Sequence, residues 1–301
     1  MNKKNIILQI IISFMLLSCL NIDRDKPVDK SKLRGRDYRL FQDTPAWELA
    51  KAVQDGNEKK INDIVDKKPE LINYQEPKFG NTLLMLTVCN QQMKSFKILL
   101  DKDADVNIHD TCDGTSALID ACGLIASDIM FIIFNQFDNR FAEMLIEHGA
   151  NVNDIETGER RQGNSTRYTP LMMASEECNI TLVKLLISKG ANVNYQNEFD
   201  QSALSKCVML GKYEVALYLL QNGADYTQPI YYIPEDNRAD YIENPPKKIP
   251  VYLIDILREG HTFDLSIKNE KYRKKVIDFL KDKEKDNISP AGANLQFLPR
   301  K

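Results

Sequence analysis

The sequence contains few of the residues on which catalytic and metal-binding sites are built. Its 301 residues include three histidines, six cysteines and one tryptophan. His109, His148 and His261 lie far apart and lack the spacing of metal ligands. The motifs H-E-x-x-H and G-x-S-x-G and a phosphate-binding glycine loop are missing. We therefore expect no enzymatic activity, no cofactor and no metal site.

The cysteines are too few and too irregularly spaced for a disulfide framework. One of them, Cys19, lies near the N-terminus. Cys112 falls in an expected loop and should be the most exposed thiol. The other four fall in or near expected helices, where a thiol packs as a small apolar side chain: Cys89, Cys122, Cys178 and Cys207.

Positive charge is not in excess. The chain has 40 Lys and Arg against 43 Asp and Glu, a formal net charge of −3. Nucleic-acid binding depends on clustered positive charge, so we expect no nucleic-acid partner.

The first residues have the features of an export signal. Lys3 and Lys4 precede an apolar run over 6–17, which is too short for a membrane-spanning helix of about 20 residues. The run ends Leu16-Leu17-Ser18-Cys19, which resembles the lipobox of bacterial lipoproteins. The resemblance implies a signal peptide over 1–18 and acylation of Cys19, which would anchor the protein in a membrane. An ordinary cleaved signal and an uncleaved anchor are the alternatives.

The residue after Cys19 is Leu20, not the Asp that retains enterobacterial lipoproteins in the inner membrane. This favours the outer membrane of a bacterial cell envelope, with the rest of the chain facing the periplasm. Residues 19–44 are charged, contain Pro27 and Gly35, and cannot bury enough apolar surface to fold alone. We interpret them as a lipidated flexible tether, which would span about 25–30 Å on average.

Four later segments repeat one another. Each begins with Thr or Ser and continues with an apolar stretch that has a small residue in its last position: Thr82 to Thr87, Ser116 to Ala121, Thr169 to Ala174 and Ser202 to Cys207. A second apolar stretch follows, and then a turn with Asn or Asp, as in Gly149-Ala150-Asn151-Val152-Asn153. The Thr or Ser is suited to cap a helix, and the glycines of the turns are suited to end one in the left-handed conformation.

This unit resembles the ankyrin repeat, which has about 33 residues and a T-P-L-H-x-A core. The best copy is Thr169-Pro170-Leu171-Met172-Met173-Ala174, with Met172 where the family has His. Weaker copies begin at Trp47 and near Val251, and three of the five intervals between starts are 33–35 residues. The alternative is an irregular helical bundle with chance similarity.

The resemblance implies a mostly α fold: an ankyrin-repeat solenoid of about six helix-turn-helix units with finger loops. The solenoid would cover residues 45–285, with a flexible tail over 286–301. Two units carry insertions, at 124–140 and 226–249. The first contains an apolar run over 129–134, which could form an exposed lip but is expected to pack internally. The second is rich in aromatic residues and proline and could pack or bind.

Ankyrin repeats mostly bind proteins, through the finger tips and the exposed face of the first helix of each unit. Carried onto this chain, the candidate finger residues are Lys78, Phe79, Asn81, Asp113, Thr166, Tyr168, Phe199 and Gln201. The candidate helix residues are Glu176, Glu177 and Met209. Phe79 and Phe199 are equivalent in their units and are either contact anchors or folded back onto their own fingers.

The sequence thus predicts an envelope-anchored, monomeric protein–protein interaction module. A specific hypothesis is an immunity protein that occludes a toxin delivered to the periplasm. The alternative is a structural scaffold that organises resident envelope proteins.

Overall fold

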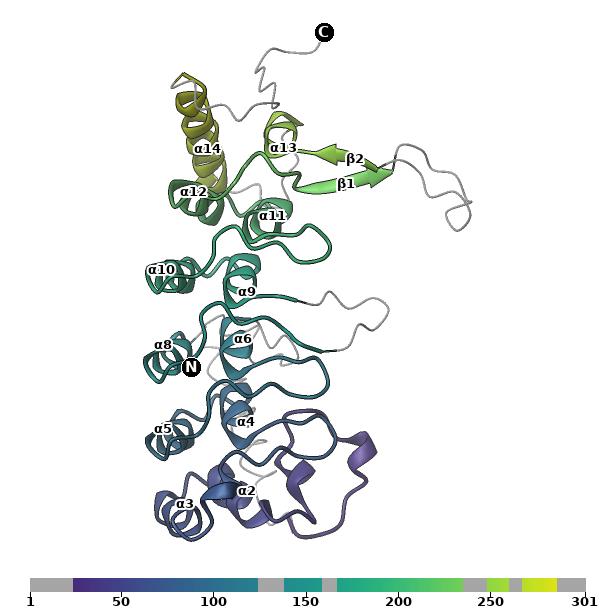
Figure 1. The fold of residues 1–301 in the computed structure, drawn as a ribbon, viewed down its shortest axis with the longest axis vertical. Coiled ribbons are helices and arrows are strands. Elements are labelled where there is room, and N and C mark those ends of the chain that lie inside the picture. The colour runs from purple at the N-terminus through teal and green to yellow at the C-terminus, as the bar shows by residue number, and fades with distance from the viewer. Residues whose placement is uncertain (1–23, 124–137, 159–166, 235–247, 260–266, 286–301) are drawn as a thin grey trace, which may run out of the picture.

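The computed structural model describes residues 24–123, 138–158, 167–234, 248–259 and 267–285. In these ranges the α-helices form two parallel columns, one helix of each unit in each column (Figure 1). The inner column consists of α2 (Trp47–Gln54), α4 (Leu83–Cys89), α6 (Ala117–Cys122), α9 (Pro170–Glu176), α11 (Ala203–Met209) and α13 (Leu253–Glu259). The outer column consists of α3 (Glu58–Val65), α5 (Met93–Asp101), α8 (Arg140–Glu147), α10 (Ile180–Ser188), α12 (Tyr213–Gln221) and α14 (Ile267–Lys285). The predicted solenoid of six helix pairs is confirmed.

Four inner helices begin directly after the Thr or Ser residues that were predicted to cap them. The hydroxyl of Thr169 accepts the backbone N–H of Met172 at 3.2 Å, and Ser202 does the same for Ser205 at 3.2 Å. Thr82 and Ser116 cap their helices in the same way. These bonds satisfy backbone donors that have no partner inside the helix, which fixes the start of each unit.

The units are held together by apolar residues of both columns. Phe96 of α5 and Phe141 of α8 are buried, and their rings meet edge to face at 4.8 Å between centroids. At the C-terminal end, Val276 and Leu280 of α14 are buried and α14 packs on α12. Aromatic contacts of this kind add about 0.5–1.5 kcal/mol to the stabilisation from burial alone.

A ladder of asparagine side chains links the turns that follow the outer helices. Asn153 accepts the N–H of Asn192 at 2.7 Å and donates to the carbonyl of Gly190 at 3.1 Å. Asn107 binds the next turn in the same way through Asn151 and Gly149, and Asn194 through Asp225 and Gly223. The glycines adopt φ values of +87° to +89°, as predicted.

Finger loops connect each outer helix to the next inner helix and project away from the outer column (Figure 1). The fingers contact one another through the backbone: Thr111 donates to the carbonyl of Phe79 at 2.8 Å, and Thr157 donates to Gly114 at 2.9 Å. The last finger is an antiparallel hairpin of β1 (Tyr231–Pro234) and β2 (Lys248–Val251), with Tyr231 opposite Val251.

The prediction that residues up to 44 form a flexible tether is wrong for residues 24–44. This segment contains two 3-10 helices, η1 (Lys30–Lys32) and η2 (Tyr38–Phe41), and packs on α2. Tyr38, Leu40 and Phe41 are at most 4% exposed. The segment has too few apolar residues to fold alone, but the first unit supplies the surface on which they are buried. Cys19, the apolar run over 129–134 and the tail over 286–301 lie outside the described residues.

The ladder gives a stability prediction. Asn153→Ala removes two hydrogen bonds between neighbouring units and leaves the N–H of Asn192 without this acceptor. We expect the free energy of unfolding to fall by about 1–2 kcal/mol in urea titrations. Asn62→Ala on α3, away from the ladder, is the control and should change stability less. Equal effects of the two substitutions would contradict the role of the ladder.

Candidate protein-binding surface

Three of the described fingers are each held by one buried acceptor at the base. Asp110, 8% exposed, accepts the backbone N–H groups of residues 112–115 over 2.7–3.2 Å. Glu76 and Asn197, 1% and 5% exposed, hold their own fingers in the same way. Sequence reasoning missed these residues, although they stand five or six positions before the Ser or Thr cap of the next helix. They make the fingers rigid before any partner binds.

The three candidate contact residues of the first finger are engaged within the chain. Lys78 donates to three backbone carbonyls of the N-terminal segment, those of Lys30, Ser31 and Leu33, at 2.8–2.9 Å. Its ammonium also lies 4.5 Å from the ring centre of Phe79, which is half-buried against the core. Asn81 donates to the carbonyl of Gly35 at 3.1 Å. The N-terminal segment therefore occupies the first finger.

The candidates in the middle of the array differ in exposure. Asp113 is exposed at a finger tip, where its carbonyl accepts the N–H of Gly158 at 3.2 Å. Tyr168 is only 7% exposed, so the expectation of an exposed aromatic there is wrong. The fourth finger turns its ring inward, under the ammonium of Lys206 at 4.2 Å from the ring centre. Thr166 lies outside the described residues.

Ionisable side chains of two units meet beside this ring. Lys206, 9% exposed, pairs with Glu176 at 3.6 Å between Nζ and Oε2. Burial lowers the pKa of Lys206 and raises the pKa of Glu176. Glu156 is 8% exposed, and burial together with Asp113 and Asp110 raises its pKa to about 7. Glu176 and Lys206 therefore form an ion pair within the array. Glu177, the next residue along the chain, is half-buried at the end of α9.

The remaining candidates lie towards the C-terminal end of the array. Phe199 is 50% exposed at the tip of its finger, and Met209 is 41% exposed at the end of α11. Gln201 is half-buried and accepts the side-chain amide of Asn197 at 3.1 Å. Phe199 and Phe79 are therefore equivalent in sequence and different in exposure.

The structure adds residues to this end that the sequence did not single out as contacts. In the described ranges, the large apolar side chains that are at least 36% exposed all fall between residues 199 and 252: Phe199, Met209, Leu210, Tyr231, Tyr232, Ile233, Ile249 and Tyr252. They belong to two adjacent fingers and the end of α11, and we call them the C-terminal apolar surface. The aromatic residues of the insertion at 226–249 were the feature of the sequence that could have indicated contact residues in the hairpin.

The described part of the chain offers no other recognisable site. No group of three or more His, Cys, Asp or Glu residues within it lies where it could hold a metal ion. His109 instead contacts Asp154, 2.9 Å from its Nε2. None of the helices in these ranges is long and apolar enough to cross a membrane.

A mostly helical array of helix-turn-helix units with projecting fingers defines a repeat solenoid. Comparison with known families identifies its units. Residues 79–111 match the ankyrin repeat, and residues 129–230 match a model of ankyrin repeats in three copies. Ankyrin repeats are therefore recognised in this chain, and they indicate a protein–protein interaction module.

Curated relatives share parts of the array. An ankyrin repeat protein of Acanthamoeba polyphaga mimivirus is 39% identical over 83 residues, which are 28% of this chain and 49% of that protein. The ankyrin repeat and KH domain-containing protein mask-1 of Caenorhabditis elegans is 28% identical over 204 residues, 61% of this chain and 7% of its own. The neurogenic locus notch homolog protein 1 of Xenopus laevis is 27% identical over 172 residues, 57% of this chain and 6% of its own. The chain thus spans half or less of these relatives.

The raised pKa of Glu156 predicts a pH dependence of stability. Because the folded state holds this proton more tightly than an exposed carboxyl does, the contribution of Glu156 to stability is greatest at acidic pH. That contribution should fall as pH rises from about 4.5 to about 7 and then level off, by up to about 3 kcal/mol at about 1.4 kcal/mol per unit of pKa. Glu156→Gln should reduce the stability difference between pH 5 and pH 8 in urea titrations. Glu70→Gln, at an exposed position of the 3-10 helix η3 (Pro69–Leu71), should leave the difference unchanged.

Proposed function

We propose that this protein is an envelope-anchored binding module that recognises one protein partner through the C-terminal apolar surface. The observation that carries the proposal is the distribution of exposed apolar side chains, which in the described ranges gather on two adjacent units. Exposed apolar groups that are concentrated on neighbouring elements favour a binding site over chance exposure. Aromatic side chains on rigid fingers lose little conformational entropy when they bind.

The first finger supports this assignment, because its residues already have partners within the chain. Its residues Lys78 and Asn81 bind backbone carbonyls of the N-terminal segment, so these groups are satisfied without a partner. The buried position of Tyr168 and the pairing of Glu176 with Lys206 remove further candidates from the middle of the array. Phe199, Met209 and the hairpin remain as the apolar contact residues, and Asp113 remains as an exposed polar one.

The anchor in this proposal is an acylated Cys19. It is supported by the two lysines, the apolar run and the Leu16-Leu17-Ser18-Cys19 sequence at the N-terminus. Two or three acyl chains bind a bilayer stably, because each buried CH₂ contributes about 0.8 kcal/mol. In the proposal, the array faces the periplasm and the anchor lies in the outer membrane.

Within this proposal we favour an immunity protein that occludes a toxin over a scaffold for several resident proteins. One apolar surface at one end of the array suits one stable partner, whereas a scaffold needs several separate sites. Affinity capture with the soluble chain, residues 20–301, from crosslinked cells and from secretions of competitor cells separates the two. A single stoichiometric toxin would support immunity, and a set of resident envelope proteins would support the scaffold.

Phe199→Ala and Phe79→Ala form a matched pair, because the residues are equivalent in their units. Phe199→Ala should weaken binding of the captured partner at least about tenfold with little change in melting temperature, since its ring is half exposed. Phe79→Ala should lower the melting temperature and leave affinity nearly unchanged, since its ring packs between the core and Lys78. Calorimetry of binding and of unfolding measures both. Equal effects on affinity would contradict the assignment.

Cys19→Ala tests the anchor. The variant should lose acyl labelling and move from the detergent phase to the aqueous phase, because no thiol remains at that position to be acylated. Cys112→Ala is the control for removal of a thiol and should partition like the wild type. Unchanged partitioning of the Cys19 variant would contradict lipid anchoring.

A further inference from the structure

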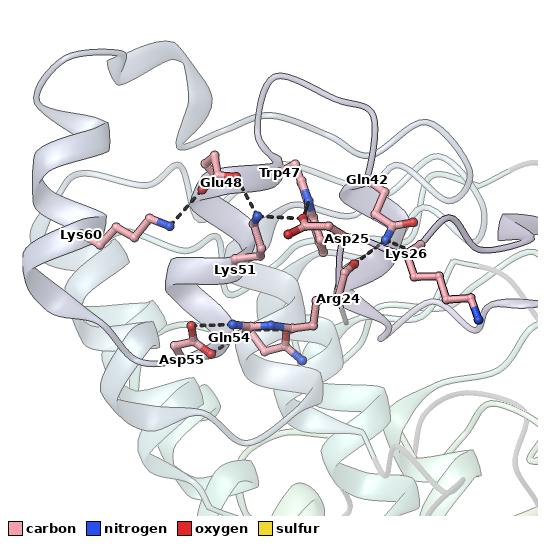
Figure 2. Close-up of polar contacts among 10 residues, drawn as sticks. All are labelled: Arg24, Asp25, Lys26, Gln42, Trp47, Glu48, Lys51, Gln54, Asp55 and Lys60. Carbon is pink, nitrogen blue, oxygen red and sulfur yellow. Dashed lines mark hydrogen bonds and ion pairs between the residues drawn. The ribbon is translucent and has the colours of Figure 1, made fainter. Parts of the chain in front are cut away.

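Residues 24–44, which we call the N-terminal strap, are attached to the first unit from their first residue. Arg24 forms a two-pronged ion pair with Asp55 after α2, with N–O distances of 2.6 and 3.0 Å. The next residue, Asp25, accepts the indole N–H of Trp47 at 2.7 Å and the ammonium of Lys51 at 2.8 Å (Figure 2). Paired guanidinium and carboxylate groups hold geometry better than single hydrogen bonds do.

The ionisation of these groups supports the attachment. Hydrogen bonds from Lys51 and Trp47 lower the pKa of Asp25, and the hydrogen bond to Asp25 raises the pKa of Lys51. The hydrogen bond to Asp55 raises the pKa of Arg24. All three groups are therefore charged at neutral pH. Glu48 adds a second carboxylate to Lys51 at 2.7 Å, which completes the cluster in Figure 2.

The strap then folds back on itself and on the first finger. The side-chain amide of Gln42 donates to the carbonyls of Arg24 and Lys26, at 2.5 and 3.1 Å, which ties the two ends of the strap together. Asn90, at the end of α4, donates to the carbonyl of Arg36 at 2.9 Å. With the bonds from Lys78 and Asn81, this gives the strap polar contacts to two units along its whole length. Its buried residues Leu40 and Phe41 join the core.

We propose that the strap holds the first unit of the array directly beside the lipid surface in which the protein is anchored. This inference rests on the proposed acylation of Cys19. Only residues 20–23 separate Cys19 from Arg24, and a fully extended chain of that length reaches about 18 Å between the two Cα atoms. A flexible tether through residue 44 would instead leave the first unit about 25–30 Å away on average and free to move.

Charge in the strap fits this position. Residues 24–44 contain seven Lys or Arg and four Asp, whereas the whole chain has a formal net charge of −3. Lys26 and Arg34 are exposed, and the exposed Lys32 pairs with Asp29 at 3.2 Å within the strap. Basic side chains beside a lipid anchor are attracted to anionic headgroups, at about 1 kcal/mol each near the surface. The exposed basic side chains of the strap therefore favour an anionic lipid surface beside the first unit.

The arrangement has a consequence for the binding face. The C-terminal apolar surface lies four to five units from the strap, and neighbouring helices pack about 8–10 Å apart, so it is about 40 Å along the array from the anchored end. In this proposal, the anchor and the binding face lie at opposite ends of the array. A partner bound at the C-terminal end would therefore be held at a defined distance from the anchor.

Trp47 provides a direct test, because it is the single tryptophan of the chain and contacts the strap. The acylated full chain is placed in vesicles of phosphatidylethanolamine and phosphatidylglycerol that contain a dansyl-headgroup lipid. Energy transfer from Trp47 to dansyl then reports the distance from the first unit to the membrane. We expect strong transfer for the wild type and a several-fold decrease when about 30 Gly and Ser residues are inserted between residues 23 and 24. Such a linker averages about 30 Å and leaves the strap contacts intact.

The same linker added after Lys301 is the control and should leave the transfer unchanged. Mass spectrometry of the reconstituted chain records the acylation of Cys19. An acylated wild type that transfers no more energy than the variant with the inserted linker would overturn this inference alone. An unmodified Cys19 would overturn both this inference and the proposed anchor.

Discussion

The fold depends on the burial of each unit's apolar faces against its neighbours, because two short helices cannot enclose a core alone. Stacking aligns the turns so that each asparagine of the ladder meets the backbone of the next turn. It also places the fingers side by side, where they share backbone hydrogen bonds. The binding surface is a consequence of the same stacking, because only adjacent fingers can present side chains together.

The two terminal units each lack one neighbouring unit, and different segments cover their apolar faces. At the N-terminal end, the strap supplies Tyr38, Leu40 and Phe41 to cover the first unit. At the C-terminal end, α14 is a long helix with basic residues on its exposed side and closes the outer column. On the hairpin and the finger before it, Tyr232 and Phe199 are at least 40% exposed. The two ends of the array therefore differ in the exposure of their finger residues.

Much of the fold could be predicted from the sequence, because its determinants are local. Thr169 and Ser202 cap the helices that follow them, and Gly149 and Gly190 adopt the left-handed conformation that ends the helices before them. The repeat interval of 33–35 residues then fixes the stacking. The candidate site was predicted less well. Exposure of a finger residue depends on what packs against it, and Phe79 and Phe199 have the same local sequence position with different neighbours.

By itself the sequence determined the class of fold, the unit boundaries and the resemblance of the first nineteen residues to a lipoprotein signal. Only the tertiary structure decided that residues 24–44 are a strap, that Tyr168 turns inward and that the exposed apolar residues gather at one end. The physical reason is that caps and turns are satisfied within a few residues of the chain. Burial of a side chain and pairing of an ion are satisfied across units, by groups such as Asp55 for Arg24 that lie 31 positions away.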